Sequence, residues 1–281
     1  MMVGKGRLGA LMRGSVMVKR GLGIALAASV TLAGCVQTRQ YADVQFTPPS
    51  GDYKLLVLRP DVTVGSLTTG GMVEPRADWT DQARHSIVDA LRTQQAGRGG
   101  KLTIVEHRNE VPGVTAQELA DVERLNYVVD QSIVLHKYLG DYLPTKRGKG
   151  LDWTLGQDAV KLGQKTGYDY GLFMHAEDAQ ASGGRIALGV LGLAGCFIGF
   201  CAPNVGGQQQ LDYASLVDLK TGEVVWFNVV MAGSEIPGIK FGDLRTPQGA
   251  AQMVDRLLGR MKPGKEAVKG VVMTPEVPEK H

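Results

Sequence analysis

Aromatic residues are scarce in this chain of 281 residues: they make up 6% of it, whereas glycine occurs 38 times. Tight turns and close packing are therefore favoured over large aromatic binding surfaces. Catalytic motifs are also missing, since no Ser lies in a Gly-x-Ser-x-Gly motif and no Walker or dinucleotide-binding glycine motif is present. The five histidines lack the paired spacing of metal ligands, so the sequence predicts neither a metal site nor a cofactor.

Acidic residues are absent from residues 1–34, which hold five basic residues and a short apolar run at 21–30. The run is too short for the roughly 20 residues of a membrane-spanning helix. A cationic start, a short apolar run and small residues are typical of a secretory signal peptide, which favours cleavage over an uncleaved anchor helix. The small residues lead to a cysteine, in the order Leu32-Ala33-Gly34-Cys35.

This arrangement resembles that of bacterial lipoproteins. The resemblance implies diacylglycerol on the Cys35 thiol, cleavage before Cys35 and acylation of the new amino terminus. Val36 stands where an Asp favours inner-membrane retention in enterobacterial lipoproteins. The resemblance therefore implies attachment to the outer membrane through lipid on Cys35, facing the periplasm.

Removal of residues 1–34 changes the net charge of the chain from +3 to −2, because all five charges removed are basic. The net positive charge of the whole chain thus comes from residues 1–34. The basic loop 144–150 has no interleaved aromatic residues, so no nucleic-acid partner is expected.

Two cysteines, Cys196 and Cys201, remain once Cys35 carries lipid. The oxidising periplasm permits a disulfide between them. Such a bond would close a short loop and restrict the unfolded chain little.

The part after the leader divides into a lipid-anchored tether at 35–52, a single domain at 53–262 and a disordered tail at 263–281. Alternating patterns predict strands, helices and a Gly/Thr-rich loop at 63–75. The clearest signals are the Thr115-x-x-Glu118 capping box and a hairpin turning at Gly222. We expect an α/β (α+β) layered domain, with a mixed sheet of about five strands and helices on its faces.

The stretches YDYGLFMHAEDA and LDYASLVDLKTGEVVWFN, with the flanking elements, resemble the periplasmic α/β domain of the curli-secretion-channel (CsgG) and penicillin-binding-protein-activator (LpoB) lipoproteins. The amino-terminal domain of TolB is similar in layout. The resemblance covers most of 53–261 as a pattern. It implies a scaffold, activator or pore, and it transfers no catalytic residue.

The uncharged, Gly-rich segment 186–203 is an insertion between two predicted strands. Burial or a protein contact is favoured over membrane insertion, because exposed apolar patches of soluble folds more often meet protein than lipid. The side chains expected to make a protein or membrane contact are those of Leu188, Val190, Leu191, Leu193, Phe197, Ile198 and Phe200.

His175 and Glu177 form the nearest approach to a titratable cluster, and on a strand they share one face while Asp178 points away. Neither a nucleophile nor a metal is indicated beside them, so a hydrolase is disfavoured. The sequence predicts a non-enzymatic envelope lipoprotein that binds a partner protein or itself. The alternative is an oligomeric, membrane-inserting secretion or pore component.

Overall fold

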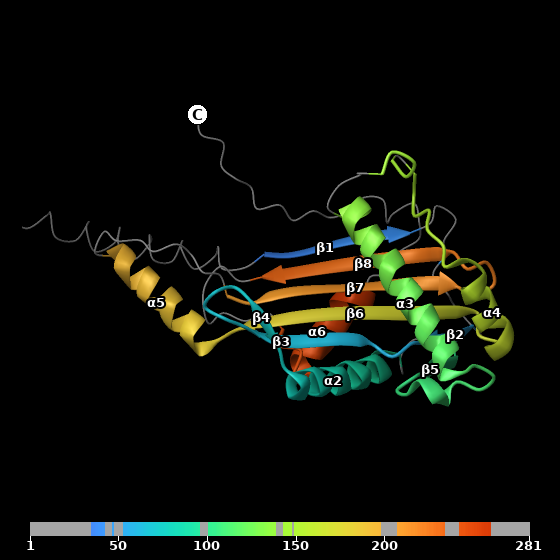
Figure 1. The fold of residues 1–281 in the computed structure, drawn as a ribbon, viewed down its shortest axis with the longest axis horizontal. Helices are drawn as coiled ribbons and strands as arrows, with labels where there is room; N and C mark the ends of the chain where they lie inside the picture. The colour runs from blue at the N-terminus through green and yellow to red at the C-terminus, as the bar shows by residue number, and fades with distance from the viewer. Residues whose placement is uncertain are drawn as a thin grey trace, which may run out of the picture.

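The computed structural model describes residues 35–42, 47, 53–95, 101–138, 143–147, 149–197, 207–233 and 242–259. In these residues a mixed sheet of eight strands carries helices on both faces (Figure 1). The layered α/β class expected from the sequence is confirmed, and the sheet is larger than the five strands expected.

The strands are β1 (Cys35–Ala42), β2 (Lys54–Val57), β3 (Asp61–Leu67), β4 (Val73–Pro75), β5 (Lys101–Ile104), β6 (Tyr170–Ala181), β7 (Gln209–Asp218) and β8 (Val224–Gly233). The helices are α2 (Ala77–Gln95), α3 (Ala116–Ile133), α4 (Gly156–Thr166), α5 (Gly183–Phe197) and α6 (Pro247–Leu258). A 3-10 turn, η2 (Arg108–Glu110), precedes α3, and a π turn, η3 (Val134–Tyr138), extends it. No helix in these ranges is long and apolar enough to cross a bilayer.

The sheet has the order β1-β8-β7-β6-β2-β5. Its first four strands are antiparallel to one another, whereas β2 runs parallel to both β6 and β5. The long strand β6 also pairs with β3, which continues the line of β2 and carries β4 on its outer side.

Two hydrophobic cores lie on opposite faces of the sheet, because neighbouring strand residues point to opposite sides. Trp226 packs with α2 and α6 on one face, and Phe227 packs with α3 and α4 on the other. Both aromatic side chains are fully buried. In Figure 1, α3 crosses the strands on the near side and α6 lies behind them.

The local signals of the sequence are found in the structure. The Thr115 hydroxyl accepts a hydrogen bond from the amide of Glu118, whose carboxylate accepts one from the Thr115 amide. The β7–β8 hairpin turns through Gly222, which has a φ of +78°. This positive φ is one that glycine adopts without strain.

Two segments differ from the sequence prediction. Residues 35–42, expected as part of the tether, form the edge strand β1, and 63–75, expected as a loop, contains most of β3 and all of β4. Backbone pairing with β8 and β6, distant in the sequence, stabilises these strands, and local composition does not encode it. Of the predicted tether, 43–46 and 48–52 lie outside the described residues, as does the tail 263–281.

Candidate binding groove on the open face of the sheet

Helices α3 and α4 cover only part of their face of the sheet. Beyond them lie two hollows of about 610 and 700 Å³ that share Thr63 and Glu177. We call this continuous depression the sheet groove and define it by its floor residues Thr63, His175, Glu177, Leu211 and Met231.

The floor of the sheet groove consists of rows of residues that face one another across the strands. One row runs from Asp61 through His175 to Tyr213, and the next runs Thr63, Glu177, Leu211 and Met231. The following row contains Gly65, Ala179, Gln209 and Gly233, whose residues are mostly small. The groove therefore changes from charged to apolar along its length.

An irregularity between β2 and β3 brings Asp61 to the groove. Val57 pairs with Leu172 and Asp61 pairs with His175. The chain therefore advances by four residues from β2 to β3 while β6 advances by three. The extra residue is accommodated at Arg59-Pro60, as in a β-bulge that redirects a side chain.

His175 is held between two carboxylates. Its Nδ1 lies 3.1 Å from Oδ2 of Asp61 and its Nε2 lies 2.9 Å from Oε1 of Glu177. Burial opposes a charge on the ring, but the two hydrogen bonds outweigh it and raise the pKa of His175 to about 9. The same contacts lower the pKa of Asp61 and Glu177, so the cluster is an imidazolium between two carboxylates at neutral pH.

Aromatic rings fix the plane of the His175 imidazole. It stacks on Tyr213 with ring centroids 4.6 Å apart, and Tyr127 of α3 approaches it at 5.5 Å. Both ring nitrogens are hydrogen-bonded and the charge is stabilised, so His175 offers no free lone pair to abstract a proton. This arrangement suits binding through fixed charges better than acid–base catalysis.

A buried polar contact docks α3 beside the groove. Asp130 accepts a hydrogen bond of 2.8 Å from the Ser215 hydroxyl, and Asn126 donates to both side chains. Burial raises the pKa of Asp130 to about 8, so its carboxyl is largely neutral at pH 7. The position of α3, and with it one wall of the groove, therefore depends on a protonated acid.

Arginines surround the His175 end of the groove. Arg108 donates to Glu123 at 2.6 Å, and Arg84 pairs with Asp81 at 2.7 Å. Arg59 lines the same end of the groove, and its charge acts on Glu123. This end of the groove thus carries both signs of charge, which favours a polar partner surface over a purely apolar one.

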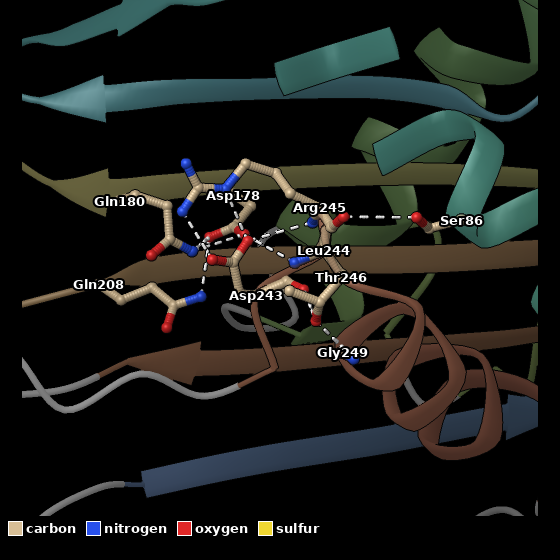
Figure 2. Close-up of polar contacts among 9 residues, drawn as sticks. All are labelled: Ser86, Asp178, Gln180, Gln208, Asp243, Leu244, Arg245, Thr246 and Gly249. Atoms are coloured by element: carbon tan, nitrogen blue, oxygen red, sulfur yellow. Dashed lines mark hydrogen bonds and ion pairs between the residues drawn. The ribbon is translucent and has the colours of Figure 1, made fainter. Parts of the chain in front are cut away.

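A second polar cluster lies on the opposite face and holds the segment before α6 (Figure 2). Asp178 accepts hydrogen bonds from Gln180, Gln208 and the Leu244 amide. Burial raises the pKa of Asp178. Arg245 is paired with Asp243 and lies over the Trp79 ring. These contacts join α2, α6 and the sheet, and we assign them a structural role.

The structure places the polar residues singled out from the sequence on both faces of the sheet. His175 and Glu177 share a face as expected, with Asp178 on the other. The sequence did not predict a role for Asp61 or Asp130. Asp61 could not be placed beside His175 because β3 was not predicted. Asp130 could have been noticed, because it falls with Asn126 on the apolar face of α3.

Cys35 is the first residue of β1, opposite Gly233. Leu188, Val190 and Leu191 lie on α5 and are exposed, so of the two outcomes favoured from the sequence, burial within the domain does not occur for them and a protein contact stays a prediction. The predicted contact residues Leu193 and Phe197, and Cys196 of the predicted disulfide, belong to α5, but only their backbone is described. Ile198, Phe200 and Cys201 lie outside the described residues, so the disulfide stays a prediction.

No known family profile and no curated protein matches this chain. Among solved structures, it is similar to a PelC dodecamer from Paraburkholderia phytofirmans, with 13% identity, a TM-score of 0.36, and coverage of 81% of this chain and 100% of that one. It is similar to the LpoB C-terminal domain from Salmonella enterica, with 17% identity, a TM-score of 0.25, and coverage of 67% and 87%. The Escherichia coli LpoB domain gives 15% identity, a TM-score of 0.26, and coverage of 66% and 86%. Likeness at this level assigns neither family nor function.

Proposed function

We propose that this chain is a lipid-anchored protein of the bacterial envelope whose sheet groove binds another protein without catalysing a reaction. The observation that carries the proposal is the His175 cluster, an imidazolium clamped by Asp61 and Glu177 at the floor of an open groove. Fixed charges of both signs orient a protein partner, while the apolar side chains beside them contribute buried area.

The anchor is supported by the sequence around Cys35, and the resemblance to lipoproteins implies the outer membrane with the domain in the periplasm. The amino-terminal peptide of the membrane-extracted protein is expected to begin at Cys35 and to carry the mass of three acyl chains. A mature chain with Cys35→Ala, exported by a signal peptide that is not of the lipoprotein type, is expected to lose its stable attachment to the membrane. An unmodified Cys35 in the native protein contradicts the lipid anchor.

The partner is tested by photo-crosslinking in cells, with the crosslinking amino acid placed at Met231 of the groove. The matched position is Gln82, which is exposed on α2, on the other face of the sheet. We expect one discrete adduct from Met231 and none of that mass from Gln82. Glu177→Lys, which reverses a groove charge, is expected to abolish the adduct, whereas Asp89→Lys on α2 leaves it.

Adducts of the same mass from both positions contradict a groove-specific contact. An adduct of twice the chain mass identifies a second copy as the occupant and favours the oligomeric alternative. The variants' circular dichroism spectra report whether a lost adduct reflects a lost fold.

A further inference from the structure

Helix α5 is apolar and takes no part in the sheet groove. It projects from one end of the sheet (Figure 1). Its exposed residues Ala187, Val190, Leu191 and Ala194 recur at the spacing of one helix face, and Leu188 flanks them. Leu191 is 67% exposed and Val190 is 53% exposed. Residues 186–197 of α5 carry no charge, so the exposed face of the helix is apolar.

The base of α5 is fixed to the sheet. The Ser182 hydroxyl accepts a hydrogen bond from the Arg185 amide, and the Ser182 amide donates to the Leu67 carbonyl. Arg185, the charged residue of α5, is turned inward, and its guanidinium donates to the Thr68 carbonyl at 2.9 Å. The exposed apolar face therefore has a defined direction relative to the strands.

Cys35 lies at the same end of the sheet. Strand pairing places Cys35, Gly233, Gln209 and Ala179 in one line across β1, β8, β7 and β6. α5 begins at Gly183, four residues beyond Ala179. Three strand spacings and four residues along a strand put the base of α5 about 20 Å from Cys35.

A second apolar feature joins them at this end. The β3–β4 hairpin turns beside the base of α5, and Met72 at its tip is 73% exposed. Residues 65–73 carry no charge. The anchor residue, the hairpin tip and α5 thus lie at one end of the molecule, where the hairpin and residues 186–197 carry no charge.

We infer that α5 inserts its exposed side chains into the lipid leaflet that holds the acyl chains of Cys35. The inference rests on the proposed function, because lipid on Cys35 brings this end of the sheet to the membrane. This proximity favours lipid over the protein contact expected from the sequence. A helix of 15 residues is about 22 Å long, shorter than the roughly 30 Å hydrocarbon core. α5 therefore enters one leaflet and does not cross the bilayer.

The test removes the lipid so that α5 alone is measured. The mature chain with Cys35→Ala is mixed with vesicles of phosphatidylethanolamine and phosphatidylglycerol in equal parts, and flotation gives the partition constant. We expect binding on the order of 10³–10⁴ M⁻¹ from the exposed apolar side chains. Leu191→Gln is expected to weaken it about tenfold, and Leu188→Gln with Leu191→Gln about a hundredfold.

The matched control is Leu135→Gln, which replaces a leucine that is 47% exposed on η3, away from this end. It should leave the partition constant unchanged within about twofold. Absence of vesicle binding, or equal losses in the Leu191 and Leu135 variants, overturns the inference. The Cys35→Ala protein could instead form oligomers without binding vesicles, and Leu191→Gln could abolish these oligomers. That result would identify a protein contact for α5 and would also overturn the inference.

These outcomes are separable from those for the proposed function. Vesicle binding by the Cys35→Ala protein together with an unmodified native Cys35 would refute the lipid anchor and retain a membrane-inserted α5. A lipidated native protein whose Cys35→Ala form ignores vesicles would retain the anchor and refute the insertion.

Discussion

The carboxyl of Asp130 gives the sharpest test of how α3 is held against the sheet. Burial raises its pKa from 3.8 to about 8, and it is fully enclosed beside Ser215. Because the folded pKa is above the unfolded one, the folded chain binds the proton more tightly. The free energy of unfolding therefore falls by up to about 1.4 kcal/mol per pH unit between about pH 4 and pH 8.

Over the whole shift this amounts to about 6 kcal/mol. This figure is an upper limit, since local opening of α3 lets the carboxylate reach water at lower cost. Asp130→Asn removes the charge and retains an oxygen that can accept from Ser215. We expect the variant to be more stable than the parent by about 2–4 kcal/mol near pH 9, and by less than about 1.5 kcal/mol near pH 5.

Urea unfolding followed by circular dichroism at several pH values measures this difference. Asp158→Asn, on the exposed surface of α4, controls for the loss of one carboxylate. It should change the free energy of unfolding by less than about 0.5 kcal/mol throughout. The account of Asp130 is refuted if the two proteins differ in free energy of unfolding by the same amount at every pH. It is also refuted if the parent becomes the more stable of the two as the pH rises.

Three further predictions concern the fold and the groove. The imidazole of His175, followed by nuclear magnetic resonance, should titrate near its pKa of about 9. The stability that the charged ring contributes should be complete below about pH 6.5 and lost as the pH rises through the folded pKa. Titration of the ring below neutrality would contradict its placement between two carboxylates. Gly222→Ala should cost about 3 kcal/mol or more, because the new Cβ would lie 2.4 Å from a carbonyl oxygen of α4. Gly71→Ala, also at positive φ but in open space, should cost only about 1 kcal/mol, and equal losses on chemical unfolding would contradict the close approach. Thr115→Ala should lose about 1 kcal/mol with the cap of α3, while no loss would show that the cap is not stabilising.

Local chemistry explains which elements the sequence predicts well. Thr115 and Glu118 satisfy each other's amides within one turn, and Gly222 supplies the positive φ of a tight hairpin. Helix periodicity likewise locates α3, because its buried residues recur on one face. None of these features needs a partner from elsewhere in the chain.

The elements that the sequence did not predict depend on distant partners. β1 pairs with β8, about 190 residues away, and its polar composition is compatible with either a tether or an edge strand. β3 follows β2 after only three residues, and nothing local specifies that both pair with β6. The His175 cluster was found only in part for this reason, since Asp61 enters it through β3.

The position of β1 changes what the proposed anchor does. A tether over 35–52 would hold the domain at a variable height, but here pairing with β8 begins at Cys35 itself. Lipid on that residue would therefore hold the end of the sheet directly at the bilayer. His175 pairs in the sheet four residues before Ala179, which lies in line with Cys35, so the His175 end of the groove is about 13 Å further along the strands. A protein bound there must itself approach the membrane surface, whereas the β7–β8 turn at Gly222 faces away from it. Insertion of α5 beside the anchor would add a second point of attachment and fix the direction in which the groove opens.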